Sequence, residues 1–509
     1  MKLKDHDLKQ IDEDYLGGLP PDKLVEVSLK LLADLKEARD RLNQTPKNSS
    51  RPSGNCAPWE GGPVAEDSPV AQGPNKEAEP EEKKKKKDRD QKQSKAGPGK
   101  KKPGKQKGAK GHGRKVELAV TGVKTHRAEE CAMCGDELGE EAKFEARTGL
   151  YVLDVEMGKP GLQVSHIKHL YGASQCRCGH VTRTEPGRCA EEKGWTVALT
   201  EWHLVGPTLV SLIVCLSLRM RMSRARIQEF LQDWLGLYLS VGVINQSITE
   251  GGRAVAPVQE QLITEIEQSE LLHADETGWK ENGRLVWLWV LITPTVTLFL
   301  IGGRGWHVIA EALEGFAGWL MSDGYQAYRK YGKRLRCLAH LIRKARGLSE
   351  SLNQDAQLFG EKLLEEMVKF IKGVYRARAG PEINPKEEFA EPLAELKAWC
   401  QKHRDSDHQK TRQLAREFLN DWEAIWTVLD HPELPLTNNI AERALRHWVI
   451  ARKISYGTRT QQGSRALALL ASVIDTCRQR NVSPWTYLAE VVAERRNNNP
   501  APPLPAAIS

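Results

Sequence analysis

The sequence predicts a multidomain protein of mixed α and β structure (α+β), in which an α/β core is interrupted by a helical insertion. Three observations predict this class. With 509 residues, the chain is long enough for several domains. Apolar and β-branched runs typical of strands are confined to two regions, 116–190 and 266–348. The other stretches either repeat apolar residues at helical spacing or carry charge without any apolar pattern.

The N-terminal region, 1–48, is expected to contain one amphipathic helix from Pro21 to Gln44. Its apolar residues recur at helical spacing with charged residues between them; they are Leu24, Val27, Leu31, Leu35, Ala38 and Leu42. Fewer than about four heptads are present, so the pattern fits a coiled coil and a plain capping helix comparably well.

A basic linker is predicted for residues 49–115. Between Lys83 and Lys115, 16 Lys and Arg residues face two Asp residues, a local net charge of +14 in a chain whose total is +8. The rest of the chain is therefore slightly acidic. Because the linker has almost no apolar residues to bury, we expect it to be disordered. It fits a solvated spacer and a nucleic-acid-binding arm equally well.

Two cysteine pairs frame the β-rich runs of residues 116–190. Cys131 and Cys134 form the first pair, and Cys176 and Cys178 form the second. Zinc prefers four tetrahedral nitrogen or sulfur ligands, and short cysteine spacing supplies each half of such a site. We expect these four thiols to hold a structural Zn²⁺. The tighter second pair leaves His180 or Cys189 as an alternative ligand, and four unligated thiols remain the competing interpretation.

The location expected from the sequence is cytoplasmic. Ten cysteines in a chain of this length do not indicate a secreted disulfide scaffold. The first residues lack the apolar segment of a signal peptide. The longest apolar run, Leu204 to Leu218, contains Gly206 and Pro207 and is shorter than the roughly 20 residues of a membrane span.

Residues 191–265 are predicted to be helical. A helix around Met222 to Leu231, a turn at Gly236 to Leu239 and a second helix opening at Ser240 resemble a helix-turn-helix. A plain helical hairpin explains the same pattern at least as well.

A core is predicted to follow in two parts, 266–348 and 433–480, separated by a helical insertion at 349–432 and followed by a tail at 481–509. The first part combines a strand reaching Asp275, a hairpin around Pro294, a strand ending at Asp323 and a basic helix after Leu338. The second part opens with a helix that carries Glu442 in its first turn.

Three acidic residues in this core are suited to metal chemistry. Asp275 and Asp323 each end a predicted strand, and strand ends aim side chains rigidly. Glu442 lies early in a helix that Thr437, Asn438 or Asn439 can cap. Each acid alone has a bland explanation, but together they can hold two divalent cations beside a phosphodiester. Glu276 is the rival of Asp275, although strand alternation directs it to the other face.

The core segments resemble bacterial insertion-sequence transposases of the IS66 family, which are DDE transposases. The resemblance extends from the N-terminal helix to about Val492, and its most specific parts are the acidic motifs. The matching segments are 272–277, 323–328, 337–344, 438–446, 457–458, 463–466 and 481–488.

That resemblance implies an RNase H-like catalytic core in which Asp275, Asp323 and Glu442 bind Mg²⁺ or Mn²⁺. It implies strand cleavage at the ends of the element and attack of the freed 3′ hydroxyl on target DNA, without a covalent protein intermediate. It also includes a zinc-finger-like region at the position of the cysteine pairs. For Cys337 and His340, which match a Cys-x-x-His pattern of such cores, we favour structural packing over catalysis.

The implied partners are DNA, both element ends and target, further copies of the chain on that DNA, and small companion proteins. Such a protein would act at the nucleoid and not at a membrane. Basic residues after Glu442 are candidate phosphate contacts, with solvated helix faces as the equal alternative; they are Arg443, Arg446, Arg452, Lys453 and Arg459. The competing functions are a non-catalytic DNA-binding regulator derived from a transposase and an RNase H-like nuclease without strand transfer.

Overall fold

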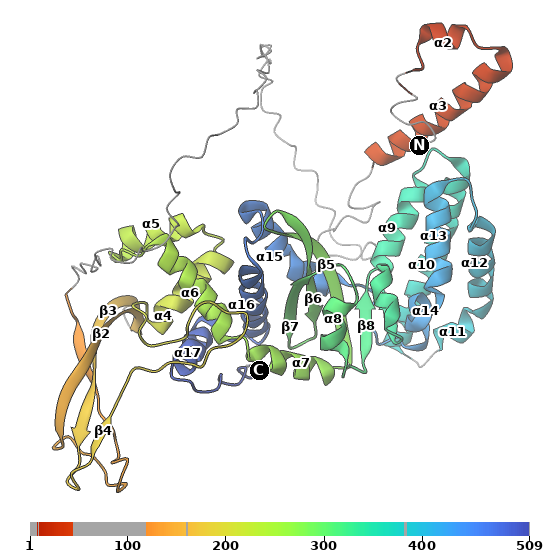
Figure 1. Cartoon of the computed structure of the whole chain (residues 1–509). Coiled ribbons are helices and arrows are strands. Elements are labelled where there is room, and N and C mark those ends of the chain that lie inside the picture. Colours follow the sequence, from red (N-terminus) through yellow and green to blue (C-terminus); the bar gives the residue numbers. More distant parts are fainter. Residues whose placement is uncertain (1–7, 9, 44–118, 159–160, 381–383, 508–509) are drawn as a thin grey trace. The chain divides into compact units, whose positions relative to one another are not determined.

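The computed structural model describes residues 8, 10–43, 119–158, 161–380 and 384–507 and has mixed α/β architecture (Figure 1). The predicted linker lies outside these residues. From Val120 onward, the described residues form one compact unit together with the N-terminal helices. In the described part of the chain, no helix combines the length and apolar character needed to cross a lipid bilayer.

The predicted N-terminal helix is present as α3 (Pro21–Leu42), preceded by the short α2 (Glu13–Gly17). Near the end of α3, the Asp40 carboxylate accepts hydrogen bonds from Ser351 Oγ at 2.5 Å and from Leu352 N at 3.1 Å. These bonds join α3 to the loop at the start of the helical insertion. Whether α3 also forms a coiled coil stays a prediction.

The cysteine-containing region forms a small sheet, as its β-rich runs predict. Its strands are β1 (Gly122–His126), β2 (Lys143–Gly158), β3 (Gly161–Gln175) and β4 (Val181–Arg183). The long β3 pairs with all three others, in parallel with β1 and antiparallel to β2 and β4.

The next region, predicted to be helical over 191–265, has its first helix at Pro207, since proline favours the first position of a helix. Its helices are α4 (Pro207–Val214), a π-helical turn (Cys215–Arg219), α5 (Arg224–Leu235), α6 (Val241–Ala254) and α7 (Val258–Glu267). The predicted helix, turn and helix are confirmed. Ser223 and Ser240 cap α5 and α6, and Gly236 ends α5 with φ of 65°.

A second, five-stranded sheet forms the core. Its strands are β5 (Leu271–Glu281), β6 (Arg284–Ile292), β7 (Thr297–Gly302), β8 (Trp319–Ser322) and β9 (Arg334–Arg336). Their order is β7-β6-β5-β8-β9, with β5, β6 and β7 forming an antiparallel meander and β8 and β9 added in parallel. The prediction that Asp275 ends its strand is wrong, because β5 continues to Glu281 as half of a hairpin with β6. Pairing of β5 with β8, however, stops at His273.

Helices complete this core. Between β7 and β9 lie α8 (His307–Ala310) and two 3-10 turns (Glu311–Leu313 and Gln326–Lys330). After β9 come α9 (Leu338–Ser349), α10 (Gln354–Ala379), α11 (Pro385–Glu388), α12 (Ala390–His403), α13 (Gln409–Asn420) and α14 (Trp422–Asp430). The chain then forms α15 (Asn439–Ser455), α16 (Gln461–Gln479) and α17 (Pro484–Arg496).

The helical insertion packs beside β8 and β9 (Figure 1) and shares one hydrophobic core with them. That core joins Met321 and Leu335 of the sheet to Phe359, Phe370 and Trp426 of the insertion. On the other side of the sheet, α16 binds the edge strand β7, where Thr476 Oγ1 and Ser472 Oγ accept the backbone N–H groups of Thr297 and Phe299.

Candidate functional site

Asp275 lies in the middle of β5, just past the point where pairing with β8 stops. Its Oδ1 accepts the backbone N–H of Glu276 at 2.9 Å. Burial raises the pKa of this carboxyl well above its ordinary value, and the charges of Asp323, Glu276 and Glu442 add to the effect. Burial and the neighbouring acids therefore disfavour the ionised form of Asp275.

Asp323 follows β8 directly. Its Oδ1 accepts the backbone N–H of Tyr325 at 2.8 Å, which fixes the turn after the strand. Asp323 is therefore both a turn residue, which is the purely structural interpretation, and an acid at the end of a strand, as the predicted metal site requires. Its charge acts on three neighbouring carboxyls, because it raises the pKa values of Asp275, Glu276 and Glu442.

Glu442 is in the first turn of α15, as predicted, and its side chain is 9% exposed. Its Oε1 lies 3.4 Å from a guanidinium nitrogen of the buried Arg343 and 3.5 Å from His340 Nε2, both on α9. Burial raises the pKa of Glu442, the guanidinium of Arg343 opposes that rise, and Asp323 adds to it.

The three acids thus share one electrostatic environment, although they are not gathered at ligand distance. Among the described residues, two groups of His, Cys, Asp or Glu have ligand atoms within 4.8 Å of one another. One is the set of four cysteines, and the other is Cys337, His340 and Glu442. Neither contains Asp275 or Asp323.

A buried asparagine fixes the start of α15 against β5. Asn438 donates from Nδ2 to the carbonyl of Ala274 at 2.8 Å, and its Oδ1 is 3.0 Å from His273 Nδ1. Its backbone N–H donates to Cys337 Sγ at 3.2 Å. The prediction that an Asn or Thr side chain caps α15 is wrong for Asn438, which occupies the cap position without a side-chain capping bond. Its amide is used instead to hold Glu442's helix beside Asp275's strand.

Glu276 has its own partners, although the charge of Asp323 also raises its pKa; its placement on the other face of β5 stays a prediction. Glu276 accepts from Tyr328 Oη at 2.7 Å and from Arg304 at 2.9 Å. Sequence reasoning missed Arg304, Tyr328 and the role of Asn438. Only Asn438 gave a signal, as the residue before the helix that carries Glu442.

The four cysteines meet as predicted. The Sγ distances are 3.6 Å for Cys131–Cys178 and Cys134–Cys176, and 3.5 Å for Cys134–Cys178. Tetrahedral zinc–sulfur bonds place sulfurs about 3.8 Å apart, so the donor set fits a Zn²⁺ ion with little adjustment. Neither alternative ligand, His180 or Cys189, belongs to the cluster.

Backbone turns explain why these thiols converge. Gly135 N donates to the carbonyl of Cys131 and Gly179 N to that of Cys176, both at 2.9 Å. Both glycines have positive φ, 75° and 87°, which glycine adopts without strain. Backbone N–H groups facing the sulfur, chiefly that of Cys134, lower the pKa of Cys131 to about 6, whereas neighbouring thiols and burial raise the pKa values of Cys134 and Cys176. Without a metal, the cluster therefore favours one thiolate among its thiols, and a bound Zn²⁺ would have to displace the remaining protons.

Of the predicted phosphate contacts, Arg443, Arg446, Lys453 and Arg459 are exposed, whereas Arg452 is half-buried. Arg452 donates to Thr277 Oγ1 at 3.2 Å and so ties α15 to β5. The exposed side chains can contact a ligand, whereas Arg452 stabilises the packing of α15 on β5.

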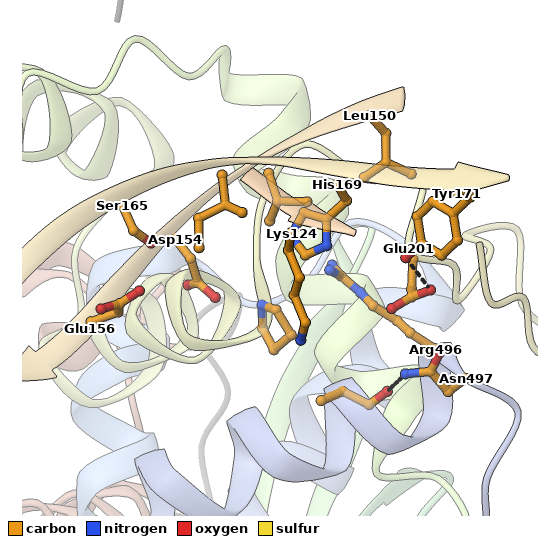
Figure 2. Close-up of a pocket in the computed structure, with 14 residues that line it drawn as sticks. Lys124, Leu150, Asp154, Glu156, Ser165, His169, Tyr171, Glu201, Arg496 and Asn497 are labelled. Carbon is orange, nitrogen blue, oxygen red and sulfur yellow. Dashed lines mark hydrogen bonds between the residues drawn. The ribbon is translucent and has the colours of Figure 1, made fainter. Parts of the chain in front are cut away.

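A separate polar cavity of about 210 Å³ lies between the first sheet and helices α4 and α17 (Figure 2). On its wall, Asp154 Oδ1 accepts the N–H of Leu209 at 2.6 Å and so caps α4 from β2. Tyr171 donates to Glu201 at 2.9 Å, and Arg496 pairs with the buried Glu250 at 2.8 Å. Each of these polar groups thus has a protein partner, and the cavity walls connect the cysteine-containing region to the helices that follow it.

Comparison with known proteins agrees with the resemblance. The family model described as "Transposase IS66 family" matches residues 203–466, which begins after the four cysteines and ends in α16. Two relatives come from Sinorhizobium fredii (strain NBRC 101917 / NGR234). "Uncharacterized protein y4qI" is 25% identical over 312 residues, covering 54% of this chain and 57% of the relative. "Uncharacterized protein y4hP" is 24% identical over 298 residues, covering 51% of this chain and 54% of the relative.

The chain spans about half the length of these curated relatives, and their printed names assign them no activity. The family model, in contrast, covers more than half of this chain and includes all three candidate acids. The protein therefore belongs to the IS66 family of transposases.

Proposed function

We propose that this protein cleaves DNA strands at the ends of an insertion element and transfers the freed strands into target DNA, with Asp275, Asp323 and Glu442 as its metal-binding acids. The observation that carries the proposal is that these three residues, from distant segments of a transposase-family chain, lie within electrostatic reach of one another: the charges of Asp323 and Glu442 raise the pKa of Asp275, and the charge of Asp323 raises the pKa of Glu442. Carboxyls whose pKa values are raised by neighbouring carboxylates are stabilised as anions by a bound cation.

An RNase H-like core fits the order of the second sheet. Three antiparallel strands continue into two parallel ones, with Asp275 on the central strand β5 and Asp323 directly after its parallel neighbour β8. Glu442 comes from α15, which packs on β5. Two acids at adjacent strands and one on a helix above them supply oxygen ligands from three directions.

The donor set fits Mg²⁺ or Mn²⁺, because both prefer carboxylate oxygens. When bound, such ions neutralise the attacking and leaving oxygens of a phosphodiester. The chain's own groups prepare this site. Asn438 fixes the helix that carries Glu442, and Arg343 holds the Glu442 carboxylate until the ligand set assembles.

Structural Zn²⁺ held by Cys131, Cys134, Cys176 and Cys178 would stabilise the first sheet. The α5–α6 pair is our candidate for recognising element ends, since it has the helix-turn-helix order. The exposed Arg443, Arg446 and Lys453, which follow Glu442 on α15, would contact phosphates near the cleaved bond. Because two ends must be joined, we expect further copies of the chain on DNA, and companion proteins remain a prediction.

The test is a supercoiled plasmid that carries the element's two ends, incubated with the full chain and Mg²⁺. Cleavage at those ends followed by joining to a second plasmid is the expected result. Nicking without joining would favour an RNase H-like nuclease. Binding without cleavage, in Mg²⁺ and in Mn²⁺, would favour a DNA-binding regulator and contradict the proposal.

A further inference from the structure

A second set of potential metal ligands shares Glu442 with the proposed catalytic acids. It consists of Cys337, His340 and Glu442, whose ligand atoms all lie within 4.8 Å of one another. His340 Nε2 is 3.5 Å from Glu442 Oε1. Cys337 is fully buried at the start of α9, and the exposed fractions of the His340 and Glu442 side chains are 14% and 9%.

The chemistry of this set differs from that of the carboxylates around Asp275. One sulfur, one imidazole nitrogen and one carboxylate oxygen are typical zinc ligands, whereas Mg²⁺ prefers oxygen alone. Tetrahedral zinc places such atoms about 3.3–3.8 Å apart, so the pair of His340 and Glu442 already fits. The Cys337 sulfur needs to move by no more than about 1 Å to complete the set.

Spacing alone does not create this arrangement. Cys400 and His403 on α12 have the same Cys-x-x-His spacing, and both belong to the described residues. In the described part of the chain, no acidic residue lies close enough to those two to complete a group of three ligands. What distinguishes the Cys337 pair is the arrival of Glu442 on α15, held in place by the bond from Asn438 N to Cys337 Sγ.

The charges of the ligands also permit a divalent cation at this site. The positive charges of Arg343, Lys344 and Arg336, on α9 and β9, lie near His340 and oppose it. A Cys337 thiolate and the Glu442 carboxylate together cancel the two charges of the ion. Binding would release the Cys337 proton to solvent and replace the ion pair between Glu442 and Arg343.

His340 Nδ1 is buried without a hydrogen-bond partner among the described residues. Zinc-binding imidazoles usually donate from the second ring nitrogen, and loss of that bond weakens binding by about 10–100-fold. This site should therefore bind zinc less tightly than the four cysteines do.

We propose that Cys337, His340 and Glu442 form a second, weaker Zn²⁺ site that withdraws Glu442 from the Mg²⁺-binding acids. Zinc bound there inhibits strand cleavage. The metal site stands on its own geometry, whereas the inhibition rests on the proposed function because it requires Glu442 to be catalytic.

Zinc binding is tested first, on the full chain and without DNA. Metal content after equilibration in buffers of graded free Zn²⁺ should rise from about one to about two ions per chain, in two separated steps. The Cys337→Ser variant should keep the tight step and lose the weak one. Cys400→Ser is the matched control, because it removes a buried thiol of the same spacing and should retain both steps.

Cobalt distinguishes the two sites by their sulfur content. Co²⁺ added to zinc-loaded wild-type chain should produce a weak sulfur-to-metal charge-transfer band that Cys337→Ser lacks and Cys400→Ser retains. A weak zinc step that persists in folded Cys337→Ser would overturn the proposed site. So would the absence of any second step in the wild type.

Inhibition is tested next, with each rate divided by the same variant's zinc-free rate in Mg²⁺. Zinc at the concentration that fills the weak site should slow wild-type cleavage at least about tenfold, and Cys337→Ser should tolerate at least about tenfold more zinc. Equal zinc sensitivity of both chains would overturn the inhibition. If the zinc step depends on Cys337 but neither chain cleaves DNA in Mg²⁺, the metal site stands and the proposed function fails.

Discussion

The two metal-suited clusters of this molecule are prepared in different ways. The four cysteines lie on two short turns, and their sulfurs are already 3.5–3.6 Å apart. The acids Asp275, Asp323 and Glu442 come from segments up to 167 residues apart, and their ligand atoms are not gathered within the same reach. Thiols are neutral or repel one another only weakly, so they can lie close together before an ion binds. Three carboxylates, in contrast, repel one another.

This difference shows which part of each site the fold supplies. In the cysteine cluster, glycines with positive φ and backbone hydrogen bonds shape the donor atoms themselves. Around the acids, the fold supplies only their surroundings, through Asn438, Arg343 and the turn at Asp323. We expect a bound cation to bring the acids to ligand distance.

Zinc removal should have the largest effect on structure. Zinc contributes roughly 10–16 kcal/mol of binding free energy in small zinc modules. A strong chelator, or Cys134→Ser, should therefore raise amide hydrogen exchange throughout 122–183. The second sheet, 271–302, should stay protected and serves as the internal reference.

Cys189→Ser is the control for that experiment, since Cys189 is buried but outside the cluster. An unchanged thermal melt and unchanged exchange after chelation would show that the four thiols need no metal.

Loss of one acid should have the next largest effect. Asp275→Asn and Glu442→Gln should each slow Mg²⁺-dependent cleavage at least about 10²–10³-fold, because an acid that binds the metal is replaced by a neutral amide. DNA binding, measured by fluorescence anisotropy, should persist.

Asp475→Asn provides the comparison. Asp475 is a buried acid on α16, with a pKa raised to about 6 by burial, and it accepts a hydrogen bond from Trp448 that asparagine can also accept. Its cleavage rate should stay close to that of the wild type. Normal cleavage by Asp275→Asn would remove Asp275 from the proposed site.

Asn438→Ala should have a smaller effect, confined to the support of the acids. It leaves the Ala274 carbonyl buried without its Asn438 partner, which costs about 1–3 kcal/mol. Urea unfolding should show this loss, and the Mg²⁺ concentration needed for half-maximal cleavage should rise. Asn439→Ala, at the half-buried next position, should change stability by less than about 0.5 kcal/mol; equal effects of the two variants would contradict the role given to Asn438.

The pH dependence should be the mildest effect. Burial, together with the charge of Asp323, raises the pKa values of Asp275 and Glu442 in the folded chain. Cleavage should therefore fall as pH is lowered through these raised values, and added Mg²⁺ should shift the fall to lower pH by competing with protons.

Without metal, the sign for stability is the opposite. When the pKa of an acid is raised in the folded state, the folded chain loses stability as the pH rises from the ordinary pKa of that acid towards the raised pKa. The reason is that the unfolded chain releases the proton first. Denaturant unfolding at several pH values, with and without Mg²⁺, measures this. A pH profile of cleavage that Mg²⁺ does not move would contradict metal binding by these acids.

Local sequence patterns predicted much of the fold. Helical spacing predicted α3, a helix around Met222 to Leu231 with a turn at Gly236 and a second helix opening at Ser240 predicted the α5–α6 pair, and the apolar runs around Pro294 predicted the β6–β7 hairpin. These features depend on residues within one element. The end of β5 was predicted wrongly because Trp279 and Lys280 continue the hairpin with β6, and that pairing is decided by a partner strand.

The candidate site was predictable only in part, for the same reason. Its acids could be named from short motifs, but the use of Asn438 across elements depends on where α15 meets β5. Glu276 has two partners, Arg304 and Tyr328, and both come from segments later in the chain. Such contacts follow from tertiary packing, which spacing within one segment does not reveal.

α9 and the helical insertion together leave and rejoin the core at almost the same point, since Leu338 N donates to the carbonyl of Leu436 at 2.9 Å. A segment with adjoining ends can be lengthened, shortened or exchanged at little entropic cost to the protein that carries it. Its shared packing with β8 and β9 would still have to be replaced, and α9 would have to stay, because it carries His340 and Arg343. For protein engineers, the helices beyond α9 are accordingly the natural place to graft a domain with a different partner onto this transposase-family protein.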